Sequence, residues 1–243
     1  MRRIFRLLVL LTTSLQACLS FLLRRFHGPL TTAERAEWLH HWCSVVLRRL
    51  GIGISSQGPF PIRGLLVSNH LSYLDILVFS AISPCVFVSK KEVRSWPLYG
   101  CLATTAGTVF VDRTRSTDTP RANQLMANAL SQGNVVVLFP EGTSSDGTSI
   151  LPFHAGLFES AVTLQEPVFT AYIRYQAEKG SVENDICYWG TMTFLPHLLR
   201  LMSVRGIRAE VRFSSEGRQF EDRKVAANTT RNLIGSLRFE TKH

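Results

Sequence analysis

After residue 60 the chain alternates between short apolar runs and longer amphipathic segments. Runs rich in valine and leucine are typical of strands buried on both faces of a sheet, and the intervening segments have helical spacing. The expected strands are Leu65–Ser68, Val86–Ser89, Thr108–Val111, Val135–Phe139, Val168–Ile173, Ile186–Thr193 and Ala209–Phe213. The expected helices cover residues 74–82, 92–104, 120–132, 154–163, 196–204 and 223–237. This alternation predicts an α/β fold with a mixed, largely parallel sheet flanked by helices.

The N-terminal region has a different pattern, because residues 7–23 are apolar and uncharged and have arginines on both sides. A stretch of this length is at the short end of what crosses a bilayer. No small-residue cleavage site follows it, which argues against a removed signal peptide. A spanning helix and a helix lying in one leaflet both remain open, since basic residues on both flanks give little orientation. We therefore expect attachment to a membrane.

A second helix is expected at residues 31–50, where apolar side chains recur at helical spacing. Thr31 or Thr32 can cap it, with Glu34 at the capping-box distance from Thr31. Residues 4–23 and 31–50 would then be two consecutive helices at the N-terminus. The predicted organisation is a membrane-associated helical segment at residues 1–52 and an α/β domain at residues 53–243.

The net charge and the spacing of cysteines and histidines limit which kinds of molecule the protein can be expected to bind. The chain has 243 residues and a formal net charge of +9, which favours an anionic partner such as a lipid surface or a phosphorylated substrate. Zinc-finger, basic-zipper and RNP-like patterns are absent from the sequence, so nucleic acid is not an expected partner. The cysteines number five, with no CxxC pair, and the histidines are scattered. Neither a disulfide framework nor a metal site is expected.

The first segment with candidate chemistry is Asn69–Asp75, directly after an expected strand. A single turn can bring His70 and Asp75 together. A carboxylate that accepts a hydrogen bond from one imidazole nitrogen leaves the other nitrogen free to take a proton from a hydroxyl. Taken alone the pair is weak evidence, because an Asp at a helix start often caps a structural histidine.

Two further polar groups follow expected strands. Arg113 closes the strand Thr108–Val111 and can grip a phosphate or carboxylate with two hydrogen bonds. The sequence Phe139-Pro140-Glu141-Gly142-Thr143 ends a very apolar run in a tight turn, from which Glu141 and Thr143 can project. A surface ion pair and an ordinary turn are the plain alternatives.

Together, these segments resemble the glycerolipid acyltransferase family, which includes 1-acyl-glycerol-3-phosphate acyltransferases. The resemblance covers about residues 60–215 and rests on motifs in the family's order. The matching residues are His70 and Asp75 in the first motif, Gly107, Phe110 and Arg113 in the second, Phe139 to Thr143 in the third and Pro167 in the fourth. Glu166 departs from the aliphatic residue usual before that proline.

The resemblance implies that His70 and Asp75 form the catalytic pair, with His70 as general base and Asp75 orienting it. It also implies an acceptor site. Arg113 would bind the headgroup, Glu141 and Gly142 would position the acceptor, and Gly107 and Thr143 belong to the same site. Lys91, followed by Trp96-Pro97-Leu98-Tyr99-Gly100, resembles a segment that contributes a lysine to phosphate binding.

The implied reaction is transfer of a fatty acyl group from acyl-CoA or acyl-carrier protein to the free hydroxyl of a lysolipid. The first expected acceptor is 1-acyl-sn-glycerol-3-phosphate, giving phosphatidic acid. Lyso-ornithine lipid is the alternative, because Ile186 to Met192 looks like a segment of enzymes acting on it. Relatives also commonly carry lysine where His154 or Ala155 stands, which argues against a plain phosphate headgroup. No cofactor is implied. The resemblance also implies that residues 4–23 and 31–50 form an N-terminal membrane-attaching helix pair. The expected location is the cytoplasmic face of the inner or cell membrane, with membrane lipids as partners.

A serine-type lipid hydrolase is the alternative from another class. Ser72 lies near His70, but the chain has no Gly-x-Ser-x-Gly elbow.

Overall fold

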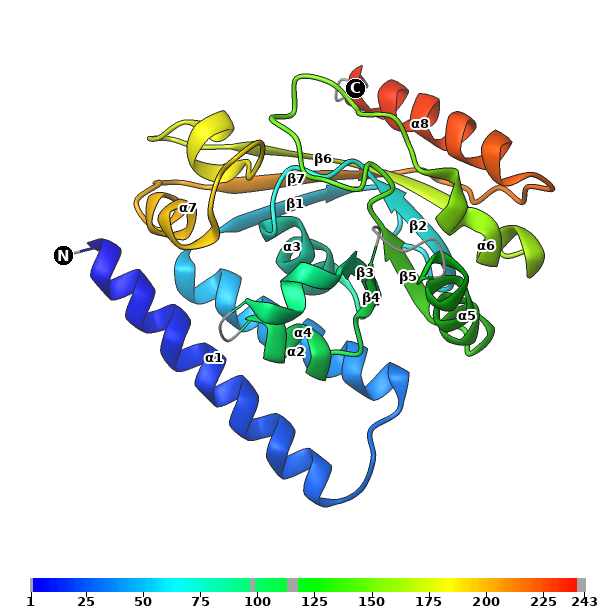
Figure 1. The fold of residues 1–243 in the computed structure, drawn as a ribbon. Coiled ribbons are helices and arrows are strands. Elements are labelled where there is room, and N and C mark those ends of the chain that lie inside the picture. Colours follow the sequence, from blue (N-terminus) through cyan, green and yellow to red (C-terminus); the bar gives the residue numbers. More distant parts are fainter. Residues whose placement is uncertain (1, 97–98, 113–117, 240–243) are drawn as a thin grey trace.

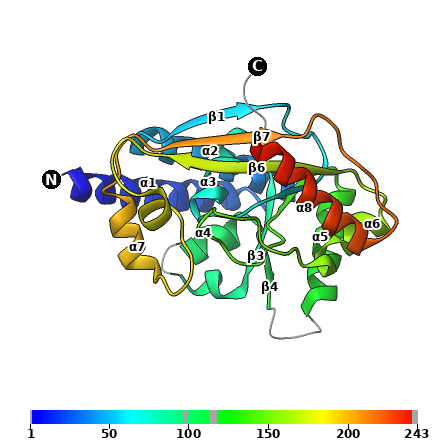
Figure 2. The same ribbon diagram turned by 90° about the horizontal axis from the view of Figure 1, so that it is seen from above.

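The computed structural model describes residues 2–96, 99–112 and 118–239. In these residues a central sheet holds strands in the order β1-β7-β6-β2-β5-β3-β4 (Figures 1 and 2). Its neighbours pair in parallel, except that β6 and β7 are antiparallel. The bounds are β1 Gly53–Gln57, β2 Gly64–Ser68, β3 Val86–Lys90, β4 Val109–Val111, β5 Val135–Leu138, β6 Val168–Gln176 and β7 Arg208–Phe213. The mixed, largely parallel sheet predicted from the sequence is confirmed.

Helices cover both faces of the sheet. The α-helices are α1 Arg2–Phe26, α2 Thr32–Leu50, α3 Leu74–Ile82, α4 Tyr99–Thr105, α5 Asp118–Ser131, α6 Glu159–Thr163, α7 Phe194–Leu201 and α8 Arg223–Phe239. Two short 3₁₀ helices, η1 Lys91–Ser95 and η2 Ala155–Phe158, and a π-helical turn, η3 Val182–Ile186, complete the list. One core contains side chains of α2, α3 and α7, and the other contains side chains of α5, α6 and α8.

The central strands are buried on both sides, as continuous apolar runs predict. In β2, Leu65 and Val67 belong to the core under α5 and α8, whereas Leu66 belongs to the core under α3. All three side chains are fully buried. Because β2 lies in the middle of the sheet, its carboxyl end holds the next residues, 69–75, at a fixed position.

The N-terminal helices pack against each other along α1 (Figure 1). The predicted capping box is confirmed, since Thr31 and Glu34 exchange hydrogen bonds at the start of α2. The indole nitrogens of Trp38 and Trp42 both donate to Ser20 Oγ of α1, at 2.9 and 2.8 Å. The opposite face of α1 exposes large apolar side chains: Ile4, Phe5, Leu8, Leu11, Leu15, Leu19, Leu22, Leu23 and Phe26.

The structure corrects the prediction of a strand at Ile186–Thr193. This segment begins at the end of η3 and continues as a loop. Its backbone is satisfied elsewhere, because Tyr188 N donates to Leu71 O and the Cys187 carbonyl is bonded to His197 Nε2. Both places beside β6 in the sheet are occupied, one by β2 and the other by β7.

Other expected elements differ in extent. The strand β1 was not expected, because Gly53–Gln57 is a half-exposed, polar edge strand with no apolar run. The helix expected at residues 92–104 is divided into η1 and α4. The two pack closely at Gly100, where a Cβ would lie 2.0 Å from the Arg94 carbonyl oxygen, so only glycine fits there. The helix expected at residues 154–163 is likewise divided into η2 and α6.

Candidate active site

His70 and Asp75 meet in one turn between β2 and α3. The His70 Nδ1 atom lies 2.7 Å from Asp75 Oδ2. The backbone amides of Leu71 and Ser72 donate to the same oxygen, at 2.7 and 3.1 Å. Asp75 is fully buried in the first turn of α3, so its carboxylate is held by hydrogen bonds rather than by water. The turn therefore fixes one nitrogen of the imidazole.

The rest of the His70 ring is also held. The ring of Phe139 stacks on it, with centroids 4.2 Å apart and planes 15° apart. His70 N donates to Glu141 Oε1 at 3.0 Å, and the His70 side chain is 19% exposed. With Nδ1 bound to Asp75, Nε2 is the nitrogen left to face the cavity that His70 lines. Such an imidazole can take a proton from a hydroxyl bound in that cavity.

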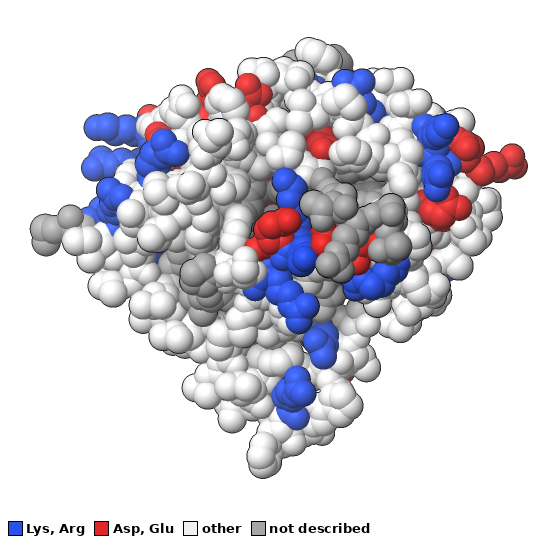
Figure 3. Space-filling view, in the orientation of Figure 1, with Lys and Arg blue, Asp and Glu red and all other residues white. Residues whose placement is uncertain are grey.

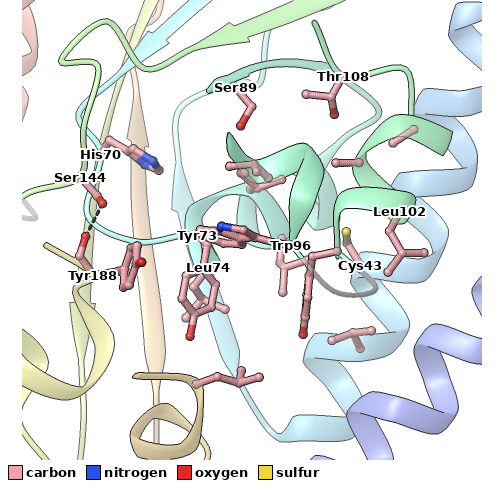
Figure 4. A pocket seen from close by; sticks show the side chains of 18 of the residues that line it. Cys43, His70, Tyr73, Leu74, Ser89, Trp96, Leu102, Thr108, Ser144 and Tyr188 are labelled. Carbon is pink, nitrogen blue, oxygen red and sulfur yellow. Dashed lines mark hydrogen bonds between the residues drawn. The ribbon is translucent and has the colours of Figure 1, made fainter. Parts of the chain in front are cut away.

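The cavity beside His70 has a volume of about 610 Å³ (Figure 4). Most of its wall is apolar and comes from α1, α2, α3 and α4, including Leu10, Trp38 and Val46. Trp96 and Tyr188 also line it, and the Ser144 hydroxyl next to His70 donates to the Tyr188 carbonyl. A largely apolar space of this size, with the His70 imidazole in its wall, is suited to a lipid chain with a reacting group at its head.

Glu141 is buried and forms a brace between two loops. Its carboxylate accepts hydrogen bonds from His70 N and from Leu151 N, at 3.0 and 3.1 Å. Burial is the main reason that the pKa of Glu141 is raised to about 7, and the nearby Asp75 charge adds to it. The observed contacts therefore hold the backbone of His70. Contact of Glu141 with an acceptor remains a prediction.

The raised pKa of Glu141 predicts a pH-dependent stability. The pKa of a Glu in the unfolded chain is near 4.5, whereas the pKa of Glu141 in the folded protein is about 7. Between these values the folded state binds more protons, so the free energy of unfolding falls as the pH rises. We expect a fall of about 3 kcal/mol relative to Glu141→Gln over this range. Urea unfolding in detergent at pH 4.5 to 7.5 measures it, and a difference between the two proteins that does not change with pH would contradict it.

Of the other residues predicted to bind the acceptor, some line the cavity and some do not. Gly142 and Thr143 line the cavity, and Gly142 has a φ of +76° in the turn after β5. Gly107, with a φ of +79°, turns the chain from α4 into β4. The neighbouring Lys90, not Lys91, lines the cavity, while Lys91 Nζ binds Asp112 Oδ2 at 3.0 Å. Arg113 lies outside the described residues.

Glu166, the departure from the family pattern before Pro167, has a local explanation. Its buried carboxylate binds Arg63 through Nη2 at 2.7 Å and Nε at 3.3 Å. Arg63 lies just before β2, and Pro167 O accepts from Leu65 N. The acidic residue therefore ties the starts of β2 and β6 together without touching the cavity.

Two residues that hold the site were not assigned a role from the sequence. The Asn69 side chain bonds to both the amide and the carbonyl of Ile173, at 2.8 and 3.0 Å. Tyr175 Oη donates to Asp75 Oδ1 at 2.5 Å. Asn69 stands inside the first motif, which was a usable signal. Tyr175 is about a hundred positions from Asp75, and no local pattern links the two.

This fold and site define an acyltransferase, and the chain belongs to that family. The family model described as Acyltransferase matches residues 55–174. A lyso-ornithine lipid O-acyltransferase of Brucella abortus is 37% identical over 212 residues, covering 79% of this chain and 78% of that protein. A 1-acyl-sn-glycerol-3-phosphate acyltransferase of Neisseria meningitidis is 40% identical over 138 residues, covering 56% of this chain and 54% of that protein.

The fold is also similar to a solved structure. The crystal structure of the 1-acyl-sn-glycerophosphate (LPA) acyltransferase PlsC from Thermotoga maritima matches all of both chains with a TM-score of 0.64. The sequences are 19% identical, so this likeness shows the fold. The family expected from the motifs is confirmed.

Proposed function

We propose that this protein transfers a fatty acyl group from a thioester donor to the free hydroxyl of a lysolipid. One observation carries the proposal. A histidine fixed by a buried carboxylate at 2.7 Å stands at the wall of a large apolar cavity. The base needs a hydroxyl to act on, and the cavity selects a substrate with a long apolar chain.

In the proposed reaction His70 Nε2 takes the proton of the acceptor hydroxyl as its oxygen attacks the thioester carbonyl. A carbon–oxygen bond forms, the carbon–sulfur bond breaks, and the proton passes from the imidazolium to the departing thiolate. Asp75 holds His70 in the tautomer that leaves Nε2 free, and stabilises the positive charge that forms on the ring. The products are an ester and a free thiol.

The serine hydrolase alternative finds less support in the geometry. Ser72 is fully buried, and its Oγ has no hydrogen-bond partner in the described part of the chain. A nucleophilic serine needs contact with its base. We therefore assign the nucleophile to the substrate's own hydroxyl.

For the acceptor we favour lyso-ornithine lipid over 1-acyl-sn-glycerol-3-phosphate. The Brucella relative with the first name aligns with 79% of the chain, whereas the Neisseria relative with the second aligns with 56%. An ornithine headgroup carries one carboxylate and one ammonium. Charges of both signs suit it, and Lys90 and Glu92 both line the cavity. Figure 3, drawn in the orientation of Figure 1, shows acidic and basic side chains side by side near the middle of the face toward the viewer.

The acceptor is tested with purified protein in detergent and either lysolipid, each with acyl-CoA and with acyl-carrier protein as donor. We expect kcat/KM for lyso-ornithine lipid to exceed that for 1-acyl-sn-glycerol-3-phosphate by about tenfold or more, which corresponds to one well-placed ionic contact. Preference for the phosphate lipid would return the assignment to phosphatidic acid synthesis. If the protein acylated neither lysolipid, the proposal that it is a lysolipid acyltransferase would be wrong.

We also propose that the protein is attached to the cytoplasmic face of the membrane through α1, lying in the interface. The helix is long and apolar enough to cross a bilayer by length and composition. Its inner face is nevertheless bonded to the protein, because Arg6 donates to Val204 O and Arg49 donates to Thr13 Oγ1, at 2.5 and 2.9 Å. A spanning orientation would break these contacts, whereas an interfacial one keeps them and buries the apolar outer face in lipid.

This orientation predicts the effect of acidic residues on the outer face of α1. Leu11 and Leu15 are about half exposed, at 48% and 54%. Replacing both with glutamate should weaken binding to anionic vesicles by about 100-fold or more, since each buried leucine contributes roughly 1.5–3 kcal/mol. Vesicle sedimentation of the full chain measures this. The matched control is Leu125→Glu on α5, where an exposed leucine lies away from α1, and equal losses for both proteins would contradict the orientation.

A further inference from the structure

Tyr175 reaches Asp75 from the far side of the catalytic turn. Tyr175 lies in β6, is 5% exposed, and donates its hydroxyl to Asp75 Oδ1 at 2.5 Å. The other oxygen, Oδ2, accepts from His70 Nδ1 and from the amides of Leu71 and Ser72. The two oxygens thus have separate partners, and Tyr175 is the side chain that binds the oxygen turned away from His70.

The phenol can only donate in this arrangement. Burial, followed by the adjacent Asp75 charge, raises the pKa of Tyr175 well above its usual value. The hydroxyl therefore keeps its proton at neutral pH and donates it to Asp75. A hydrogen bond from a neutral donor to a buried carboxylate draws part of the negative charge toward that donor.

The strand that carries Tyr175 is itself fixed to the residue before His70. The pairing of β2 with β6 ends at Ser68 and Ala171. Beyond that point the Asn69 side chain bonds to both backbone groups of Ile173. Ile173 and Tyr175 belong to the same core on one face of the sheet. One strand therefore holds the catalytic turn at two places, through Asn69 and through Asp75.

We propose that Tyr175 is a positioning residue for acyl transfer, which sets the orientation and charge of Asp75 and acts on His70 through it. The inference rests on the proposed function, because it gives Tyr175 a role only if His70 and Asp75 act as base and orienter. Tyr175 does not line the cavity, so its effect on the substrate passes through Asp75 and His70.

The ionisable groups around His70 and Asp75 determine in which direction the pH profile of activity should shift when the Tyr175 hydroxyl is removed. Tyr175 on β6, Glu141 after β5 and Cys187 after η3 face Asp75 or His70. Burial is the main cause that raises the pKa of Cys187 to about 12, so its thiol stays neutral. Without the phenol, the Asp75 charge is shared with fewer donors. The stronger Asp75 charge then stabilises the positive charge that forms on the His70 ring and the proton on Glu141. Both effects move the acid side of the activity profile to higher pH.

The test is Tyr175→Phe, which removes the hydroxyl and keeps the ring packing. We expect kcat to fall about tenfold while KM for donor and lysolipid is unchanged, as for a lost hydrogen bond to a charged group. The acid limb of the kcat profile should move to higher pH by about half a unit or more. The matched control is Tyr172→Phe, the same change on the same strand in the core of the opposite face.

The pH profile separates positioning from damage to the fold. A smaller folded fraction would lower kcat but leave the acid limb in place. The inference is overturned if the limb of Tyr175→Phe does not move, or if Tyr172→Phe moves it equally. His70→Ala in the same assay isolates the underlying proposal. If His70→Ala stays active the base assignment fails and this inference with it, whereas an inactive His70→Ala with an unmoved Tyr175→Phe profile removes this inference alone.

Discussion

Replacing His70 with alanine should lower kcat for acyl transfer by about 10³-fold or more, within the range that general base catalysis contributes. The substitution removes the imidazole that lies 2.7 Å from Asp75 and lines the cavity. The cavity walls and the brace to Glu141 remain, because the brace uses the His70 backbone amide. Lysolipid binding should therefore change little, and initial rates at saturating donor measure the loss.

His154→Ala is the matched control for this substitution. His154 is exposed and lies at the start of η2, and its amide donates to Pro140 O. Removing its side chain should leave kcat within about twofold, as for an exposed side chain away from the chemistry. If His70→Ala retains acyl transfer at the rate of His154→Ala, the base assignment is wrong.

Replacing Asp75 with asparagine should lower kcat by about 10²- to 10³-fold, because a neutral amide no longer stabilises the positive charge on His70 and, in one of its two orientations, reverses the hydrogen bond to His70. The carboxylate accepts from His70 Nδ1 and from two backbone amides. If the asparagine keeps its oxygen toward those amides, its NH₂ group lies at the position of Oδ1. There it meets the Tyr175 hydroxyl, which must accept a hydrogen bond instead of donating one. If it turns, the NH₂ group donates to Nδ1, and Nε2 then carries the proton and cannot act as a base.

The effect of Asp75→Asn is compared with that of Asp222→Asn. Asp222 also accepts from two backbone amides, those of Lys224 and Val225, but it is exposed at the start of α8. Asparagine is as good a helix cap as aspartate, so this control should keep full activity. Thermal unfolding of both variants shows how much of the loss follows from the buried position of Asp75. Equal kcat values for the two variants would show that Asp75 does not act on His70.

The sheet and its helices were predictable because their signals are local. The strand at residues 65–68 and the helix at residues 74–82 have apolar patterns that match their burial, and both were placed correctly. The capping box of Thr31 and Glu34 was also predictable, since three residues separate its partners. The same locality explains why His70 and Asp75 could be paired from the sequence.

What could not be predicted depends on partners far away in the chain. The apolar segment Ile186–Thr193 has a strand-like composition, but its backbone bonds to Leu71 and to the His197 side chain. The edge strand β1 is polar and is formed only because β7 offers it a partner. Tyr175 and Asp75 meet because β6 lies beside β2 in the sheet, which no spacing reveals.

Glu166 stands where the family usually carries an aliphatic residue, and a nearby residue neutralises its buried charge. A buried carboxylate in place of an aliphatic side chain needs a partner, and Arg63 supplies two hydrogen bonds. Arg63 precedes β2 and Glu166 precedes β6, which are neighbours in the sheet, so the pair lies at the starts of these strands and does not contact the catalytic turn. The fourth motif can therefore vary without altering the chemistry at His70.

The most direct test of the account follows the acyl group itself. Purified full-length protein is given a thioester donor with a labelled acyl chain, acyl-CoA in one series and acyl-carrier protein in another, with and without lysolipid. We predict that free thiol and diacylated lipid form in equal amounts, only when lysolipid is present, and that the intact mass of the protein does not change. Release of thiol without lysolipid, with free fatty acid or an acylated protein as product, would contradict it.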